Sequence, residues 1–93
     1  METEILTDLY QACFYIVNGW EVLAVDCIPI GKTASYQITL QGLNHTHLAQ
    51  VWYEKKAVAN LWAFRSAYAQ INSHVQHAKR TFDLARRYPG APL

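Results

Sequence analysis

The chain has 93 residues, of which 52% are apolar and 16% are charged, and its formal net charge is +1. A chain of this length forms one domain, residues 1–93, and buries only about 60–65% of its unfolded surface. It has two cysteines, no apolar run of about eighteen residues and no basic leader, which argues against a disulfide scaffold, a membrane span and secretion. We therefore expect a cytoplasmic protein with a thin core.

The first predicted element is a helix over residues 3–17. Its apolar residues recur at spacings of four, four and three, which is typical of one helical face: Ile5, Leu9, Cys13 and Ile16. Thr3 is a suitable N-cap, and Asn18-Gly19 supplies a left-handed stop. Cys13 lies on the apolar face, so we interpret it as a small buried hydrophobic residue.

Two strands are predicted next, over residues 21–30 and 33–41. The first is rich in branched apolar residues, and Pro29 places it at a sheet edge because proline lacks an amide donor. The second alternates apolar and polar residues, as an antiparallel strand with one buried face does. Gly31-Lys32 joins the two strands in a hairpin.

The stretch at residues 47–55 is ambiguous. Val51, Trp52 and Tyr53 favour a third strand. The alternative is a helix continuous with the next one, which would reach about forty residues and be unusually long. We favour the third strand, since a lone two-stranded hairpin is marginally stable.

A long helix is predicted from about residue 57 to Tyr88, ahead of Pro89-Gly90. Its apolar residues recur at alternating spacings of three and four, in a heptad seam formed by Leu61, Phe64, Tyr68, Ile71, Val75, Ala78 and Phe82. At about 45 Å this helix exceeds a nine-residue strand of about 30 Å. We therefore expect it to overhang the sheet and leave Val75, Ala78 and Phe82 uncovered.

These elements predict an α+β fold: an N-terminal helix, an antiparallel meander of two or three strands, and a long C-terminal helix packed on the sheet. Residues 91–93 are expected to be a disordered tail. No motif in the chain is specific enough to assign a family.

Gly31-Lys32-Thr33 resembles the end of a phosphate-binding loop, but the rest of that motif is missing. The glycine that should stand five residues before Gly31 is replaced by Asp26, which would repel phosphate. The residues after Thr33 are predicted to form a strand, so no helix N-terminus faces the loop. We interpret the segment as a hairpin turn.

Four histidines are weak candidates for a metal site: His45, His47, His74 and His77. Their imidazoles could bind zinc or copper if the loop met the long helix. No cysteine or carboxylate lies beside them at ligand spacing, so we interpret them as solvated polar residues and expect no cofactor. A small-ligand or metal-binding protein remains an alternative.

Charge is distributed unevenly along the chain. Residues 1–54 carry six acidic side chains against Lys32 alone, and residues 55–93 carry seven basic side chains against Asp83 alone. We expect the two halves to attract each other, within one chain or between two. One flank of the long helix gathers basic residues that could follow phosphates in a nucleic-acid-binding module: Arg65, Lys79, Arg80, Arg86 and Arg87. Trp62 lies on the same side and could stack on a base.

An enzyme is poorly supported, because Asp26 and Cys27 are neighbours in a strand and point to opposite faces. The low charge and the twelve aromatic residues instead favour a protein that hides surface against a second chain. We therefore predict a small non-catalytic interaction or regulatory protein, most simply a homodimer. The expected interface comprises Trp52, Trp62, Phe64, Tyr68, Ile71, Val75 and Phe82.

Overall fold

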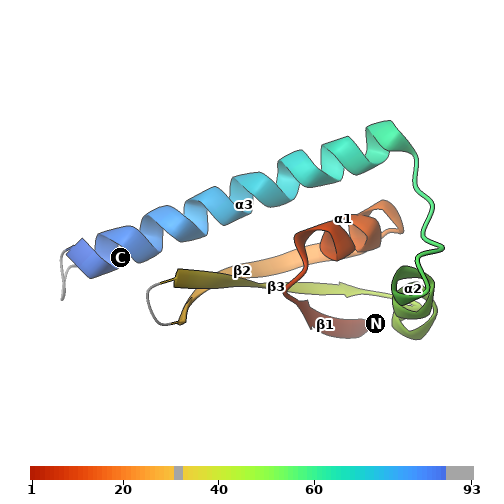
Figure 1. Cartoon of the computed structure of the whole chain (residues 1–93), viewed down its shortest axis with the longest axis horizontal. Helices are drawn as coiled ribbons and strands as arrows, with labels where there is room; N and C mark the ends of the chain where they lie inside the picture. The colour runs from red at the N-terminus through yellow and green to blue at the C-terminus, as the bar shows by residue number, and fades with distance from the viewer. Residues whose placement is uncertain (31–32, 88–93) are drawn as a thin grey trace.

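The computed structural model describes residues 1–30 and 33–87, and its description of side chains leaves out residues 33, 34, 82 and 84–87. The chain forms three strands and three helices in these ranges, in the order β1 (Glu2–Leu6), α1 (Leu9–Val17), β2 (Glu21–Ile30), β3 (Thr33–Gly42), α2 (His45–Tyr53) and α3 (Leu61–Arg87). The predicted α+β fold is confirmed: a helix, a three-stranded antiparallel sheet and a long C-terminal helix packed on that sheet (Figure 1). The expected tail at residues 91–93 lies outside the described residues.

β2 and β3 form the predicted hairpin, with Ile30 paired to Thr33. The sheet order is β1-β3-β2, so β2 is an edge strand, as Pro29 indicated. The register shifts between Val22 and Ala24, which marks a bulge in this edge. Gly31 and Lys32 lie outside the described residues, but β3 begins at Thr33 where a phosphate-binding loop would require a helix.

The prediction of a helix from residue 3 is wrong for its first part. Residues Glu2–Leu6 form β1, which pairs antiparallel with β3. The N-cap of α1 is Asp8 in place of Thr3: Asp8 Oδ1 accepts hydrogen bonds from the backbone N–H groups of Tyr10 (2.9 Å) and Gln11 (3.2 Å). The helical spacing from Ile5 to Leu9 was therefore fortuitous, because pairing with β3 outweighs the local helical pattern.

The predicted helix stop at Asn18-Gly19 is confirmed. Gly19 has φ +94°, a left-handed conformation that glycine adopts without steric cost. Its N–H donates to the Ile16 carbonyl, and the Trp20 N–H donates to the Tyr15 carbonyl, each at 3.0 Å. These two bonds satisfy the last carbonyls of α1 and turn the chain into β2.

The prediction of a third strand at residues 47–55 is also wrong, because His45–Tyr53 forms α2. The third strand is β1, which already pairs with β3 along the side opposite β2. The alternative of one continuous helix is wrong as well, since residues 54–60 separate α2 from α3. α2 ends with the same pattern of backbone hydrogen bonds as α1. The left-handed residue there is Lys55, with φ 60°, where α1 has Gly19.

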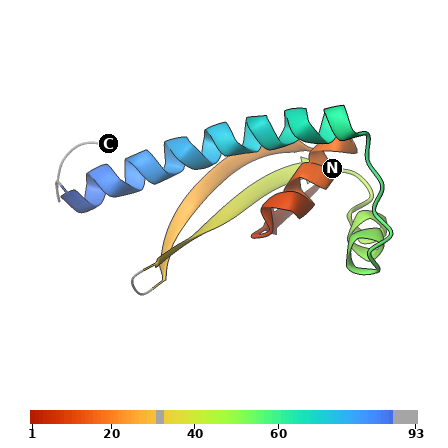
Figure 2. The same ribbon diagram turned by 45° about the horizontal axis from the view of Figure 1, so that its top comes forward.

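α3 begins at Leu61, four residues later than predicted, where the Asn60 side chain accepts a hydrogen bond from the Ala63 N–H at 3.0 Å. Ala67 and Ile71 face the body of the protein and are fully buried. Val75 and Ala78 were expected to be uncovered, but they are half-buried. The C-terminal end of α3 nevertheless continues past the hairpin in both views (Figures 1 and 2).

The core lies between one face of the sheet and the helices α1 and α3, which both cover that face (Figure 2). The strands contribute Leu6, Ile38 and Leu40 to it, each buried, in agreement with the alternation predicted for β3. The other large buried side chains come from α1, α2 and α3 and from the residue before β2, namely Phe14, Tyr15, Trp20, Leu48 and Ile71. No helix among residues 1–30 and 33–87 is long and apolar enough to cross a membrane.

Candidate functional site

The segment that joins α2 to α3 presents apolar side chains to solvent. Ala57 and Ala59 of this segment are half-buried, whereas Val58 between them is exposed. Leu61 and Trp62, the first two residues of α3, are exposed as well. Val58 is 86% exposed, Leu61 75% and Trp62 69%. We call Val58, Leu61 and Trp62 the linker surface. Three large apolar residues with this exposure within five positions are unusual for a surface that serves no contact.

A group of stacked aromatic rings lies near the start of α3. The Tyr10 ring of α1 stacks on Phe64 (centroids 6.4 Å apart) and on Tyr68 (6.1 Å) of α3. Tyr10 and Tyr68 remain exposed, whereas Phe64 is half-buried. These rings hold α1 and α3 together and also offer flat apolar surface on the outside.

The other residues of the predicted interface differ in how far their own chain buries them. Ile71 is fully buried within its own chain, so it is not accessible to a partner in this conformation. Val75 is half-buried. Trp52 is half-buried as well and stacks on Phe14 of α1, with centroids 5.8 Å apart. The Phe82 side chain lies outside the described residues.

The predicted basic flank is present on α3 as far as the structure describes it. Arg65, Lys79 and Arg80 are exposed, and their side chains make no ion pair with any described residue. The Arg65 guanidinium lies over the Trp62 ring, 5.6 Å from its centroid, in a cation–π contact. The side chains of Arg86 and Arg87 lie outside the described residues.

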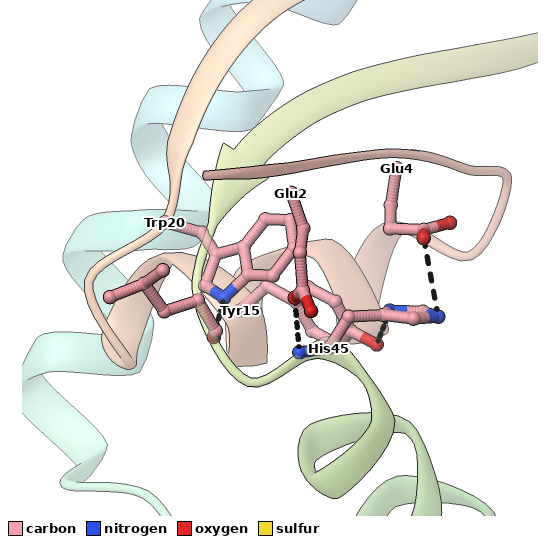
Figure 3. A network of polar contacts seen from close by, with 6 residues as sticks. Glu2, Glu4, Tyr15, Trp20 and His45 are labelled. Atoms are coloured by element: carbon pink, nitrogen blue, oxygen red, sulfur yellow. Dashed lines mark hydrogen bonds and ion pairs between the residues drawn. The ribbon is translucent and has the colours of Figure 1, made fainter.

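A polar cluster connects β1, α1 and the first residue of α2 (Figure 3). The Tyr15 hydroxyl and His45 Nδ1 share a hydrogen bond of 2.9 Å, and Glu4 Oε1 lies 3.5 Å from His45 Nε2. The His45 backbone N–H donates to Glu2 Oε2 at 2.8 Å. Asn44, the N-cap of α2, makes no capping bond with its side chain, so the Glu2 carboxylate supplies the acceptor that the helix N-terminus needs.

Trp20 lies beside this cluster and is buried. Its indole Nε1–H donates to the Leu43 carbonyl at 2.9 Å, and its ring is 4.9 Å from that of Tyr15 (Figure 3). A Cβ at Gly42 would lie 2.5 Å from the Trp20 ring, closer than any side chain tolerates. Gly42 is therefore required by packing, because the indole occupies the space of its side chain.

The buried groups of this region are poorly suited to nucleophilic catalysis. Burial raises the pKa of the Tyr15 hydroxyl, with smaller contributions in the same direction from Tyr53, Glu4 and Glu2, so Tyr15 stays protonated. The Gln11 side chain lowers the pKa of Tyr15, but by less than burial raises it. Burial also raises the pKa of the Cys13 thiol to about 11, which removes the thiolate that nucleophilic chemistry needs.

The four histidines are not assembled with other ligands in the part of the chain that the structure describes. Nowhere in that part do three or more His, Cys, Asp or Glu side chains lie together in a way that could hold a metal ion. His45 is engaged by Tyr15 and Glu4. His47 on α2 and His74 and His77 on α3 are exposed.

The contacts of Glu2 and Glu4 with His45 were not predicted, because Glu4 was assigned to a helix and Glu2 to no element. The alternation of Glu2, Glu4 and Leu6 contained the relevant signal, since residues two apart on a strand share a face. That signal identifies a shared face but not the histidine that meets it, because His45 is forty-one residues further along the chain than Glu4.

Comparison with known proteins yields no match: no family model, no curated protein and no solved structure is similar enough to this chain to indicate a family or a function.

Proposed function

We propose that this protein is a small non-catalytic interaction protein that forms a homodimer through the linker surface and the exposed rings beside it. The observation that carries the proposal is the exposure of Val58, Leu61 and Trp62, each at least two-thirds open to solvent at one end of the molecule. Aromatic and large apolar residues are the usual anchors of protein interfaces.

The distribution of charge supports a second copy as the partner. Only two ion pairs are formed among the described residues, His45–Glu4 and Lys56–Glu54, and neither uses the basic residues of α3. The acidic first half and the basic second half therefore keep most of their charge unpaired within one chain. Charges that stay unpaired within one chain can attract the complementary charges of a second copy, which favours association of like chains.

The proposed interface differs from the heptad seam as a whole. The middle of α3 packs on the chain's own sheet and α1, as the burial of the seam residue Ile71 and of Ala67, which lies outside the seam, shows. Among the side chains that the structure describes on α3 and the linker before it, the large apolar ones open to a partner lie in the linker and the first turns of α3. We also place the protein in a reducing compartment such as the cytoplasm, which the two unpaired cysteines, Cys13 and Cys27, support.

Sedimentation velocity over a wide range of protein concentration tests the proposal. We expect a concentration-dependent dimer, and we expect Leu61→Ser to weaken it by about tenfold or more, because an apolar side chain leaves the interface. Gln70→Ser, an exposed polar change on the same helix, should leave the dissociation constant unchanged. A single monomeric species at all concentrations, or equal dimerisation of the two variants, contradicts the proposal.

A nucleic-acid-binding module is the second candidate, and the Arg65–Trp62 contact favours it. An exposed indole with a guanidinium on its face can stack on an unpaired base while the arginine meets a phosphate. Fluorescence anisotropy with a labelled single strand at low salt tests this function. Binding that Arg80→Gln and Trp62→Leu both weaken supports it, and unchanged anisotropy at micromolar protein removes it.

A further inference from the structure

A pocket of about 500 Å³ opens between the start of α1, the end of α2 and the linker, and it is lined by Asp8, Trp52, Tyr53, Lys55 and Ala57. This volume falls in the range of pockets that hold small organic molecules. The pocket borders the linker surface but shares no residue with it.

Two aromatic side chains form the apolar part of the pocket. Trp52 is held in place because its ring stacks on Phe14 in the core, 5.8 Å between centroids and 30° between planes. Tyr53, the second aromatic residue of the lining, is 72% exposed. One fixed and one exposed aromatic ring suit a ligand with a planar ring system, because flat apolar faces stack on each other.

The charged residues of the pocket are not equally satisfied. Asp8 Oδ1 already accepts two backbone N–H bonds at the N-terminus of α1, where the helix dipole stabilises a negative charge. Lys56 pairs with Glu54 at 3.8 Å, but the Lys55 ammonium makes no ion pair with any described residue. Neither charged group of the lining makes an ion pair with a described residue, but Asp8 has two backbone hydrogen bonds and the Lys55 ammonium has none, so Lys55 is the less satisfied of the two.

Lys55 also has an unusual backbone. Its φ of 60° is left-handed, and it stands at the helix-end position that glycine occupies after α1. Glycine would fit this conformation better, yet the chain has a lysine there, in the lining of the pocket. A residue kept in a disfavoured conformation at a pocket is consistent with a role for its side chain.

We propose that this pocket binds a small planar aromatic acid, with the ring against Trp52 and Tyr53 and the carboxylate on the Lys55 ammonium. Asp8, which also lines the pocket, disfavours a second acidic group on the ligand, so the preferred ligand carries one negative charge. This inference does not depend on the dimer, since it uses none of Val58, Leu61 or Trp62.

Three probes of the same shape test the charge preference: naphthalene-2-carboxylate, its uncharged primary amide and the cationic naphthalen-2-ylmethanamine. Each is titrated into the ¹⁵N-labelled protein near neutral pH, and the indole N–H of Trp52 and the amide of Lys55 are followed by NMR. We expect the carboxylate to bind about fivefold more tightly than the amide, as one partly exposed ion pair allows. Equal binding of all three probes, no binding at low millimolar concentration, or shifts confined to Trp62 overturn the proposal.

Two conservative variants identify the residues responsible. Lys55→Asn removes the ammonium but keeps a residue that tolerates the left-handed conformation, and it should reduce carboxylate affinity to that of the amide without changing amide affinity. Asp8→Asn keeps the N-cap and should strengthen carboxylate binding. Unchanged carboxylate affinity in Lys55→Asn overturns the assignment of Lys55.

The same titration in Leu61→Ser separates this proposal from the proposed dimer. If Leu61→Ser is monomeric and still prefers the carboxylate, the pocket functions independently of the interface. If the chain never dimerises but the carboxylate binds, the proposed function fails and the pocket assignment stands. If a folded Leu61→Ser variant no longer binds the carboxylate, the pocket is not independent of the dimer interface, and that part of the proposal is wrong.

Discussion

At the scale of single residues, Gly42 and Trp20 depend on each other. The indole lies where the Gly42 side chain would be, and it is buried and hydrogen-bonded to the Leu43 carbonyl, so it has little freedom to move. Gly19 differs from Gly42, because apart from its chain neighbours no described residue lies within 4 Å of its Cβ position, and its φ of +94° is what demands glycine. The two glycines are thus required for different reasons, one by packing and one by backbone conformation.

Gly42→Ala is expected to lower the free energy of unfolding by about 1–3 kcal/mol, the usual cost of inserting a methyl group into a packed site. Gly19→Ala should cost about 1 kcal/mol from the left-handed backbone alone. Urea denaturation followed by circular dichroism measures both. If replacing Trp20 by leucine does not reduce the cost of Gly42→Ala, the indole is not the obstacle.

Cys13 gives a pH dependence at the same scale. Burial, with a smaller contribution from Asp8, raises the pKa of its thiol from the ordinary value of 9.0 to about 11 in the folded chain. Below pH 9 the thiol is protonated in both states and stability is unaffected. Between pH 9 and 11 the unfolded chain loses this proton and the folded chain keeps it, so the free energy of unfolding falls as the pH rises.

The expected outcome is a decrease in stability above about pH 9 that is smaller in Cys13→Ala. Tyr15, whose pKa is also raised by burial, contributes to the same decrease and leaves a remainder in the variant. Urea midpoints measured across this pH range in both proteins provide the comparison. An identical slope in the two proteins contradicts the role assigned to Cys13.

At the scale of elements, β1 holds α2 in place although the two do not pair through the backbone. Glu2 accepts the first N–H of α2, and Glu4 faces the His45 ring from the same side of the strand. The Tyr15 hydroxyl of α1 hydrogen-bonds to the same ring (Figure 3). The His45 side chain therefore contacts both β1 and α1, which are distant from it in the sequence. The short strand thereby determines where α2 begins.

A double-mutant cycle measures this connection. Tyr15→Phe removes only the hydroxyl, and His45→Gln removes the ring nitrogen that it meets. We expect each variant to lose stability and the pair to show a coupling free energy of about 1 kcal/mol, as one partly buried hydrogen bond provides. Additive losses in the cycle mean that the two side chains act separately.

At the scale of the whole molecule, the helices α1 and α3 cover one face of a small sheet, and the molecule extends over 44 × 25 × 24 Å. α3 contains 27 residues and spans about 40 Å, nearly the full length. The opposite face of the sheet exposes Ile5, Ile28 and Ile30 to between 36% and 59%, whereas Val58, Leu61 and Trp62 of the linker surface are 69–86% exposed and lie within five positions of the chain. This contrast is why the proposed dimer uses the end of the molecule at which α2 meets α3.

Local patterns in the sequence determined the hairpin, the edge position of β2, the glycine stop of α1 and the existence of α3, because turns, alternation and helical periodicity act between near neighbours. The seam did not determine which residues of α3 are buried, because Leu61 belongs to it and is 75% exposed, as exposed as Trp62 outside it. β1 and α2 were decided by the tertiary structure: residues 2–6 follow a helical spacing but gain more by pairing with β3, and residues 45–53 become helical because that edge is taken and Leu48 and Trp52 pack toward the core. The cluster of Glu2, Glu4, Tyr15 and His45 and the pocket at Lys55 arise only where these elements meet, and no pattern within any single segment contains that information.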